Sequence, residues 1–302
     1  MTRLSFGLVV ACLGGALGIA PQIDGALSLT PTPVVWLEAA SFTMGASERD
    51  VEYAVALCRA SRPVDLGSLG PVTDGACSPL RFSRELPRHQ RWTAPFGIDR
   101  TEVTHERWRH CVNAGRCPPS RVPTDQPRIA SAQMPVTGVT WAEARGFCEF
   151  AGGRLPTDAE WERAARGSHH RWRFPWGRQF NSRLANYGRS PRGPSGADGF
   201  RYAAPVGSFA DGASPHGLLD MAGNVLEWTA SAPREREVGL GADPDVYRTI
   251  RGGSWMQPPE LLRVSHRAWL PRAEHRSDLG LRCAYESGGL ARRGASVILR
   301  RP

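Results

Sequence analysis

The stretch "PVTGVTWAEARGFCEFAGGRLPTDAEWERAARG", residues 135–167, carries the clearest structural pattern of the chain. It predicts two short helices in succession, because a threonine opens each apolar run and a glutamate follows three residues later. The two threonine–glutamate pairs are Thr140 with Glu143 and Thr157 with Glu160. In such a capping box the two side chains accept hydrogen bonds from backbone amides at the start of the helix. Glycines after both runs predict where the helices end.

The same order of strand and capped helix recurs upstream. "FGIDRTEVTHERWRHCVNAG", residues 96–115, predicts a strand and then a helix that Thr104 caps, with Trp108 and Cys111 on one face. "VVWLEAASFTMGAS", residues 34–47, predicts a strand and a turn, and "ERDVEYAVALCRA" after it is a candidate helix. The chain shows no repeated succession of strand, helix and strand, so we do not expect a parallel doubly wound sheet.

The composition is that of a loop-rich protein with a substantial core. Its 302 residues include 33 Gly and 25 Pro, while 10 Trp and 10 Phe supply large apolar anchors. The formal net charge is +9, and all 38 basic residues are arginine. These arginines are scattered singly among acidic and aromatic residues without a basic run, so we do not expect nucleic-acid binding.

An export signal is predicted for residues 1–26. Arg3 precedes an apolar run, Leu4 to Ala20, that is too short and too rich in glycine for a comfortable membrane span. Cys12 in "VVAC" loosely fits a lipoprotein cleavage site, although apolar residues continue past it. We therefore expect an exported protein, periplasmic, extracellular or lipid-anchored, with no transmembrane span in the mature chain. The rest divides into a linker at 27–33, a folded domain at 34–286 and a flexible basic tail at 287–302.

Six cysteines remain beyond Cys12. An even number in an exported chain predicts three disulfides. Spacing favours a bond between Cys111 and Cys117, because Gly115 permits the tight bend in "CVNAGRC". The other pairings stay open on spacing alone. Zinc binding is the competing interpretation, and no C-x2-C or H-x3-H pattern supports it.

Several multi-residue motifs occur in order along the chain. They are "VVWLEAASFTMGAS", "DRTEVTHERW", "PVTGVTWAEARGFCEFAGGRLPTDAEWERAARG", "FPWG", "GLLDMAGNVLEWTAS", "RGGSW" and "DLGLRCA". From about Pro33 to Glu286 the chain resembles the formylglycine-generating enzyme family, also called the sulfatase-modifying-factor family. The resemblance implies an α+β fold, a variant of the C-type-lectin-like fold, loop-rich with a small antiparallel sheet and flanking helices.

The resemblance also implies a copper-dependent reaction, and this chain differs from the family at the copper-binding positions. Oxygen-dependent enzymes of the family convert a cysteine of a sulfatase peptide to formylglycine, and they bind copper(I) through two cysteines just after "RGGS". The first stands three residues beyond the serine and the second five further on. Counted from Ser254, these positions hold Gln257 and Leu262, and no cysteine lies between Cys148 and Cys283. Because copper(I) selects soft thiolates, we do not expect copper in this chain.

A disulfide and two calcium sites are further implications of the resemblance. The disulfide joins Cys148 to Cys283, which leaves Cys58 and Cys77 as the third pair. Calcium takes several hard oxygen ligands from irregular loops. The first implied site comprises Asn186, Asp198 and the carbonyls of Tyr187 and Phe200; the second comprises Asn224, Glu227 and nearby carbonyls. From the residues alone, an Asn or Asp beside glycine is more often a turn residue.

We expect a surface groove near the loop that holds Gln257 and Leu262. Its candidate side chains are Trp228, Ser254, Trp255, His266 and Arg267. The two indoles resemble aromatic residues that line the family's peptide groove, although ordinary packing would also use them. We therefore predict a monomeric, calcium-stabilised binding or envelope protein that takes a peptide, protein or glycan, without copper-dependent oxidation of cysteine. The alternative is an atypical formylglycine-generating or nonheme-metal oxidoreductase acting on a protein substrate.

Overall fold

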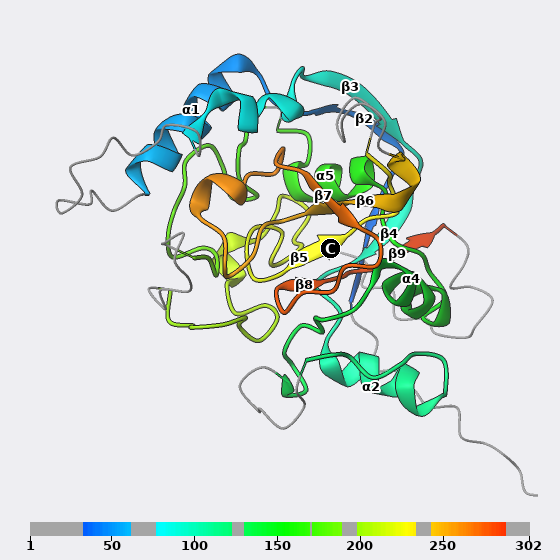
Figure 1. Cartoon of the computed structure of the whole chain (residues 1–302). Helices are drawn as coiled ribbons and strands as arrows, with labels where there is room; N and C mark the ends of the chain where they lie inside the picture. Colours follow the sequence, from blue (N-terminus) through cyan, green and yellow to red (C-terminus); the bar gives the residue numbers. More distant parts are fainter. Residues whose placement is uncertain are drawn as a thin grey trace, which may run out of the picture.

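The structure is a computed structural model that describes residues 33–61, 77–122, 130–169, 171–188, 198–233 and 243–287. The predicted export signal, most of the linker and nearly all of the tail lie outside the described residues. Short strands and helices alternate with long loops, and helices lie around the strands (Figure 1). Within the described part of the chain, no helix is both long and apolar enough to span a bilayer.

The described residues form three small sheets, which make up the framework. β4 (Phe96–Asp99) lies between β1 (Val34–Leu37) and β9 (Ala284–Glu286), and both pairings are antiparallel. This sheet therefore joins the two ends of the folded chain. β2 (Ala40–Met44) pairs with β3 (His89–Thr93). The largest sheet has the order β7–β6–β5–β8, with bounds Ala268–Pro271, Tyr247–Arg251, Leu226–Trp228 and Leu279–Gly280.

The helices begin where the sequence predicts caps. Thr104 accepts a hydrogen bond from Arg107 N at the start of α2 (His105–Asn113). The two predicted capping boxes open α4 (Trp141–Phe150) and α5 (Asp158–Arg166), and the candidate helix forms as α1 (Glu48–Ala60). Short 3₁₀ helices occur at Pro79–Arg81, Ser83–Glu85, Ala210–Gly212, Pro244–Val246 and Pro259–Leu261. Helices beside small, mostly antiparallel sheets confirm the predicted α+β class.

The largest core cluster lies between α2, α4 and the four-stranded sheet. Trp108 and Phe147 stack at 5.3 Å between ring centroids, and Trp228 of β5 is fully buried in the same cluster. The disulfide between Cys148 and Cys283 passes through it. The structure also contains disulfides between Cys58 and Cys77 and between Cys111 and Cys117, so all three expected pairs are present.

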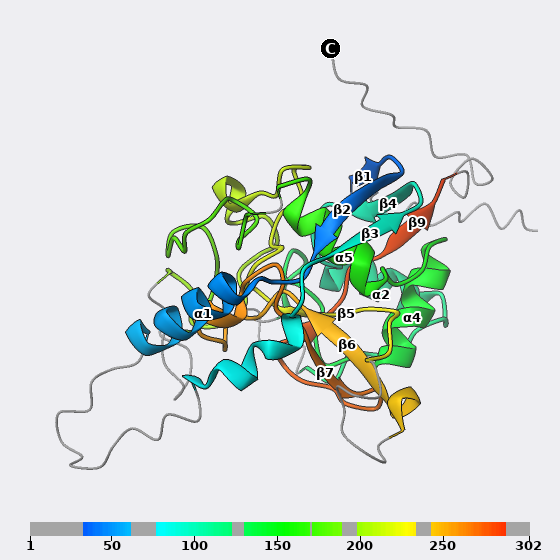
Figure 2. The ribbon, with the colours of Figure 1, turned by 90° about the horizontal axis from the view of Figure 1, so that it is seen from above.

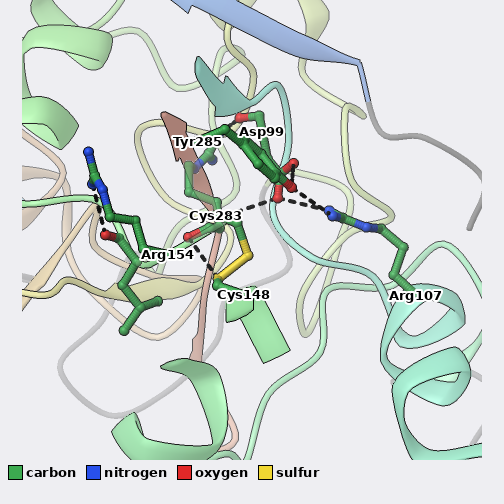
Figure 3. Close-up of a disulfide and its surroundings, with 8 residues drawn as sticks. Asp99, Arg107, Cys148, Arg154, Cys283 and Tyr285 are labelled. Atoms are coloured by element: carbon green, nitrogen blue, oxygen red, sulfur yellow. Dashed lines mark hydrogen bonds and ion pairs between the residues drawn. A yellow bond between two sulfur atoms is a disulfide. The ribbon is translucent and has the colours of Figure 1, made fainter. Parts of the chain in front are cut away.

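A buried polar cluster surrounds the long-range disulfide (Figure 3). Asp99 of β4 accepts hydrogen bonds from Cys283 N at 3.0 Å and from Arg107 Nη1 at 2.8 Å. The Tyr285 hydroxyl donates to the other carboxylate oxygen at 2.9 Å. These contacts hold β4, α2 and β9 together next to the disulfide that joins Cys148 of α4 to Cys283.

Buried arginines form ion pairs between segments that are distant in sequence. Three pairs have side chains no more than 1% exposed: Arg251 with Glu162 at 2.9 Å, Arg263 with Glu85 at 2.6 Å, and Arg282 with Glu227 at 2.7 Å. Removal of one partner from such a pair leaves an uncompensated buried charge and typically costs about 3–5 kcal/mol. The first pair joins β6 to α5, and the other two hold Arg263 against the 3₁₀ helix Ser83–Glu85 and Arg282 against β5.

Candidate functional site

The loop that follows β6 begins as a tightly bonded turn. Ser254 is fully buried, and its hydroxyl donates to Asp278 Oδ2 at 2.7 Å. Trp255 N donates to the Asn224 carbonyl, and Gln257 N donates to the Ser254 carbonyl, each at 2.9 Å. The Gln257 carbonyl in turn accepts from Gly188 N at 2.9 Å. The backbone at position 257 is thus fixed against the loop that contains Gly188.

Leu262 fills the position at which the family resemblance places the second copper thiolate. Its side chain is fully buried in a cluster with Phe174, Ala185, Tyr187 and Ala222. A Cβ on Gly253 would lie 2.9 Å from Leu262 Cδ1, so a side chain there would collide with the leucine. The neighbouring backbone therefore approaches Leu262 closely, and apolar side chains surround the leucine.

Helix α1 covers this loop. Val51, Ala54 and Val55 on one side of the helix pack with Leu261. Tyr53 and Leu57, on another side, pack against the cluster that contains Leu262. Figure 2 shows α1 lying alongside the orange segment that holds residues 259–262. The sequence motifs did not predict this cover, because their pattern says nothing about what packs on the loop.

A cavity of about 990 Å³ opens beside the covered loop. It lies between the end of α1, the Trp172–Leu184 segment, Tyr187 and Pro259. Its aromatic side chains are Trp172, Trp176, Phe180 and Tyr187, and Gln179, Asn181, Ser182 and Ser61 add hydrogen-bonding groups. Among the described lining residues, Arg178 is the charged one. Ligand sites in proteins typically combine such an apolar and aromatic wall with a few polar groups.

The aromatic wall is held in place from behind. Trp176 stacks on the buried ring of Phe174 at 5.3 Å between centroids, and Phe180 meets Tyr187 edge to face at 5.0 Å. Phe180 N donates to the Tyr53 hydroxyl at 2.9 Å. Trp172 stacks on His169 at 4.1 Å. These contacts fix the rings before a ligand arrives, which lowers the entropic cost of binding.

The five predicted groove residues do not form one groove. Trp228 is fully buried, with its Nε1 donating to the Val139 carbonyl at 3.0 Å, and Ser254 is buried as well. Trp255 is 7% exposed and meets Tyr202 edge to face. Both Trp228 and Ser254 are therefore corrected from ligand contacts to core residues. A hydrophobic strand such as "VLEW" in a small sheet favours this burial, which the motif alone did not reveal.

His266 and Arg267 belong to a different part of the surface. The His266 Nδ1 lies 3.1 Å from Glu85 Oε1, and Arg267 pairs with Asp158 at 3.4 Å. Burial lowers the pKa of His266 below its usual value, against the opposing effect of Glu85. Burial alone would raise the pKa of Glu85, but Arg263 and His266 hold it well below its usual range. Arg267 lines a separate cavity of about 370 Å³ with Trp92 and Thr249.

The four residues of the first predicted calcium site come together. Asp198 Oδ2 accepts from Tyr187 N at 2.7 Å, and its Oδ1 accepts from Phe200 N at 3.1 Å. Asn186 is 1% exposed, and its amide nitrogen donates to the Tyr202 carbonyl at 2.9 Å. Among the described residues, no donor reaches the buried Asn186 Oδ1. This orphaned oxygen, with the Asp198 carboxylate bonded to the amide of the next residue, fits the oxygen ligands that calcium requires.

The second predicted calcium site does not fit the group. Glu227 Oε2 accepts from Trp161 Nε1 and Arg282 Nε, each at 2.7 Å, and Oε1 accepts from Arg282 Nη2 at 2.8 Å. Asn224 Oδ1 accepts from Ala204 N at 2.8 Å and from the Asn186 amide at 3.2 Å. Glu227 is therefore the buried counter-ion of Arg282, and we withdraw it and Asn224 as calcium ligands.

Comparison with known proteins places this arrangement in a family. Residues 26–287 match the family described as "Sulfatase-modifying factor enzyme 1-like domain". The chain belongs to this family. Inactive C-alpha-formylglycine-generating enzyme 2 from Bos taurus is 37% identical over 163 residues, which are 52% of this chain and 52% of the relative. Hercynine oxygenase from Mycolicibacterium smegmatis is 32% identical over 257 residues, 70% of this chain and 58% of the relative.

Solved structures agree on the fold of this sulfatase-modifying-factor family member. PvdO from Pseudomonas aeruginosa superposes with a TM-score of 0.58 at 25% identity, over 84% of this chain and 94% of PvdO. Treponema denticola variable protein 1 reaches a TM-score of 0.57 at 19% identity, over 83% of this chain and 94% of its own, and shares the fold. The chain spans about half the length of the curated relatives it matches, so their activities are not transferred with the fold.

Proposed function

We propose that this protein binds a peptide or a glycan in the aromatic cavity and does not oxidise cysteine through copper. Leu262 is the observation that carries the proposal, because a fully buried leucine occupies the place of a family copper thiolate. A carbon side chain offers no electron pair to a metal, and copper(I) selects soft sulfur ligands. Gln257 at the other position supplies an amide, which is also a poor ligand for copper(I).

The cavity supports the binding half of the proposal. Trp172, Trp176 and Phe180 contribute ring surfaces, and the side chains of Gln179 and Asn181 can donate and accept hydrogen bonds at the rim. Aromatic side chains combine large contact area with few rotatable bonds, so they bind ligands at low entropic cost. Such a lining suits a neutral ligand with apolar faces and hydroxyl or amide groups, which both glycans and peptides offer.

Calcium at the first site enters the proposal as a structural ion. Asn186 and Asp198 would hold it through side-chain oxygens, and Tyr187 and Phe200 through their carbonyls. Tyr187 also lines the aromatic cavity with its side chain. An ion that orders this backbone would therefore also fix one wall of the proposed binding site. Binding of a metal to the folded state alone adds its free energy to stability.

An oxidising compartment is part of the same proposal. Three disulfides persist in secreted and periplasmic proteins and are rare where glutathione keeps thiols reduced. This supports export of the chain to the periplasm, the envelope or the medium.

Ligand titration tests the proposed function. Chitohexaose and a Cys-x-Pro-x-Arg peptide serve as a glycan probe and a peptide probe, with binding followed by calorimetry and tryptophan fluorescence. Trp172 is suited to substitution, because it lines the cavity and stacks on the exposed ring of His169. We expect one probe to saturate the wild type and Trp172→Ala to weaken that binding about tenfold, the equivalent of about 1.4 kcal/mol.

Trp36→Ala is the matched control. Trp36 lies on β1, is 46% exposed and does not line the cavity. Its substitution removes an exposed indole without touching the proposed site, so binding should stay at the wild-type level. Equal losses in both variants, or no saturable binding of either probe, would contradict the proposal.

The second candidate is an atypical formylglycine-generating or nonheme-metal oxidoreductase. Similarity to hercynine oxygenase favours it. Within the described residues, however, no group of three His, Cys, Asp or Glu side chains is placed to hold a metal ion. Metal analysis of the purified protein separates the candidates: calcium alone agrees with the binding protein, and stoichiometric copper or iron agrees with the oxidoreductase.

A further inference from the structure

The two indole rings of the aromatic cavity are each backed by another ring. Trp176 stacks on the buried ring of Phe174 with 9° between the ring planes, and Trp172 stacks on His169 with 12° between them. Trp176 Nε1 donates to the Gln179 carbonyl at 3.0 Å, which fixes the plane of this indole. A ring that is covered on one face can offer its opposite face to a ligand, and both indoles line the cavity.

The hydrogen-bonding side chains of the cavity are neutral amides and hydroxyls. Asn181 Oδ1 accepts from Arg183 N at 3.0 Å, so the side-chain nitrogen of Asn181 keeps its two donors for a ligand. Ser61 Oγ donates to the Leu57 carbonyl at 2.8 Å and can still accept. Gln179 adds a second side-chain amide. A ligand whose own groups both donate and accept hydrogen bonds matches this set.

The backbone around the cavity offers a peptide little to pair with. None of the described lining residues belongs to a strand; they lie at the end of α1, in the segment 172–184 and at two later positions. Within that segment, Arg173 N and Phe174 N both donate to the Gly177 carbonyl, which closes the chain into a turn. An extended peptide that adds to a sheet needs an edge with a row of unpaired N–H and C=O groups. This wall provides no such edge.

A helical or a basic peptide is also poorly matched. An amphipathic helix docks in a continuous apolar groove, but Gln179, Asn181 and Ser182 interrupt the apolar wall. The described lining holds no Asp or Glu, so a Lys or Arg side chain of a peptide would find no counter-ion among these residues. Arg178 is exposed to solvent. The lining therefore favours an uncharged ligand that combines flat apolar faces with hydroxyl groups.

We propose that the aromatic cavity binds a neutral glycan. Its pyranose rings lie on the indole faces of Trp172 and Trp176, and its hydroxyls form hydrogen bonds with Asn181 and Gln179. This inference rests on the proposed function and narrows the ligand to one class. The face of an aromatic ring carries partial negative charge, so it attracts the C–H bonds that the oxygens of a sugar polarise. Stacking also removes the apolar face of the sugar from water.

The size of the cavity indicates an oligosaccharide rather than a single sugar. Its volume of about 990 Å³ lies at the upper end of the range of about 300–1,000 Å³ for small-molecule sites. Two backed indoles in one cavity also provide more than one stacking position. We therefore expect affinity to increase with the length of the glycan until both indoles are covered.

Helix α1 holds the wall in the shape that this binding requires. Asp50 Oδ1 accepts from Arg173 Nε at 2.8 Å, and the guanidinium of Arg173 lies 4.4 Å from the centre of the Tyr53 ring. The Tyr53 hydroxyl accepts from Phe180 N at 2.9 Å. The helix that covers the loop with Leu262 thus also anchors both ends of the aromatic segment. Rings that are fixed in advance lower the entropic cost of binding.

Calorimetric titration of the full chain with four probes tests the inference. The probes are chitohexaose, cellohexaose, the Cys-x-Pro-x-Arg peptide and a proline-rich peptide. We expect a hexasaccharide to saturate the wild type and neither peptide to do so. Trp172→Phe keeps a ring for stacking and should change the affinity for that hexasaccharide by less than about threefold, whereas Trp172→Ala should weaken it about tenfold.

Asn181→Asp tests the hydrogen bonds. The variant keeps an oxygen for Arg183 N and removes both donors of the side-chain amide. We expect it to weaken binding of the hexasaccharide by about three- to tenfold. Asn113→Asp is the matched control, because it makes the same change of charge at an exposed position of α2 outside the cavity. Equal affinity of the two variants would overturn the proposed contact with Asn181.

The peptide probes separate failure of this inference from failure of the proposed function. Saturable binding of a peptide that Trp172→Ala weakens, without binding of either hexasaccharide, would overturn the glycan inference and leave the proposed function intact. Absence of saturable binding for all four probes would contradict the proposed function, and the inference with it.

Discussion

Leu262→Cys places sulfur at the position of the family's second copper thiolate, and the structure predicts that it destabilises the fold. The wild-type side chain is fully buried among Phe174, Tyr187 and Ala222. The cysteine side chain has two fewer heavy atoms than that of leucine, and each buried methylene contributes about 0.8 kcal/mol. Because the surrounding rings close the resulting space only partly, a cavity penalty is added, and we expect a total loss of about 2–3 kcal/mol.

Thermal and urea unfolding measure this loss. In a chain of this size, each kcal/mol of lost stability lowers Tm by about 2–4 °C. The expected loss therefore corresponds to a decrease of roughly 4–12 °C in Tm. Leu218→Cys is the matched control, because Leu218 is equally buried but packs in a separate cluster with Leu37 and Phe96. Both variants should lose similar stability. A loss below about 0.5 kcal/mol for Leu262→Cys alone, in the range of a surface substitution, would refute the close packing at position 262.

Further predictions concern the disulfides and calcium. Peptide mapping without reduction should recover Cys148 bonded to Cys283, and free thiol at either position would contradict this. Replacement of both cysteines by Ala should lower the free energy of unfolding by roughly 4–5 kcal/mol, because the bond joins residues 135 positions apart. Chelation should lower Tm by several degrees, since saturation a hundredfold above Kd contributes about 2.7 kcal/mol. Asp198→Ala should remove that response, and Asp211→Ala, at an exposed position, should retain it; an unchanged Tm on chelation would exclude the calcium site.

The sequence predicted those parts of the fold that local chemistry determines. Thr140 with Glu143 and Thr157 with Glu160 specify helix starts through contacts three residues apart, and both capping boxes form. The Cys148–Cys283 pair came from the family resemblance and not from spacing, because a bond across 135 residues leaves no local signal. The α+β class followed from the same resemblance together with the absence of a strand–helix–strand repeat.

The candidate site was predicted less completely, because it depends on contacts between distant segments. Gln257 and Leu262 could be counted from "RGGS", but the cover of α1 and the cluster around Leu262 involve residues from segments far away in the sequence, such as Tyr53 and Phe174. Trp228 was placed in a groove because aromatic side chains serve both cores and binding sites, and its burial depends on the sheet around it. Glu227 was placed on calcium by the family resemblance, and its pairing with Arg282, 55 residues away, leaves no local signal in the sequence.

The most direct test of the central claim is incubation of the purified chain with a Cys-x-Pro-x-Arg peptide, oxygen and a reductant, with and without copper(I). Mass spectrometry detects the aldehyde of formylglycine against a control without protein. Because Gln257 and Leu262 supply no thiolate for copper(I), the account predicts no aldehyde above that control under either condition. Formation of formylglycine that depends on the protein and increases with copper would contradict it.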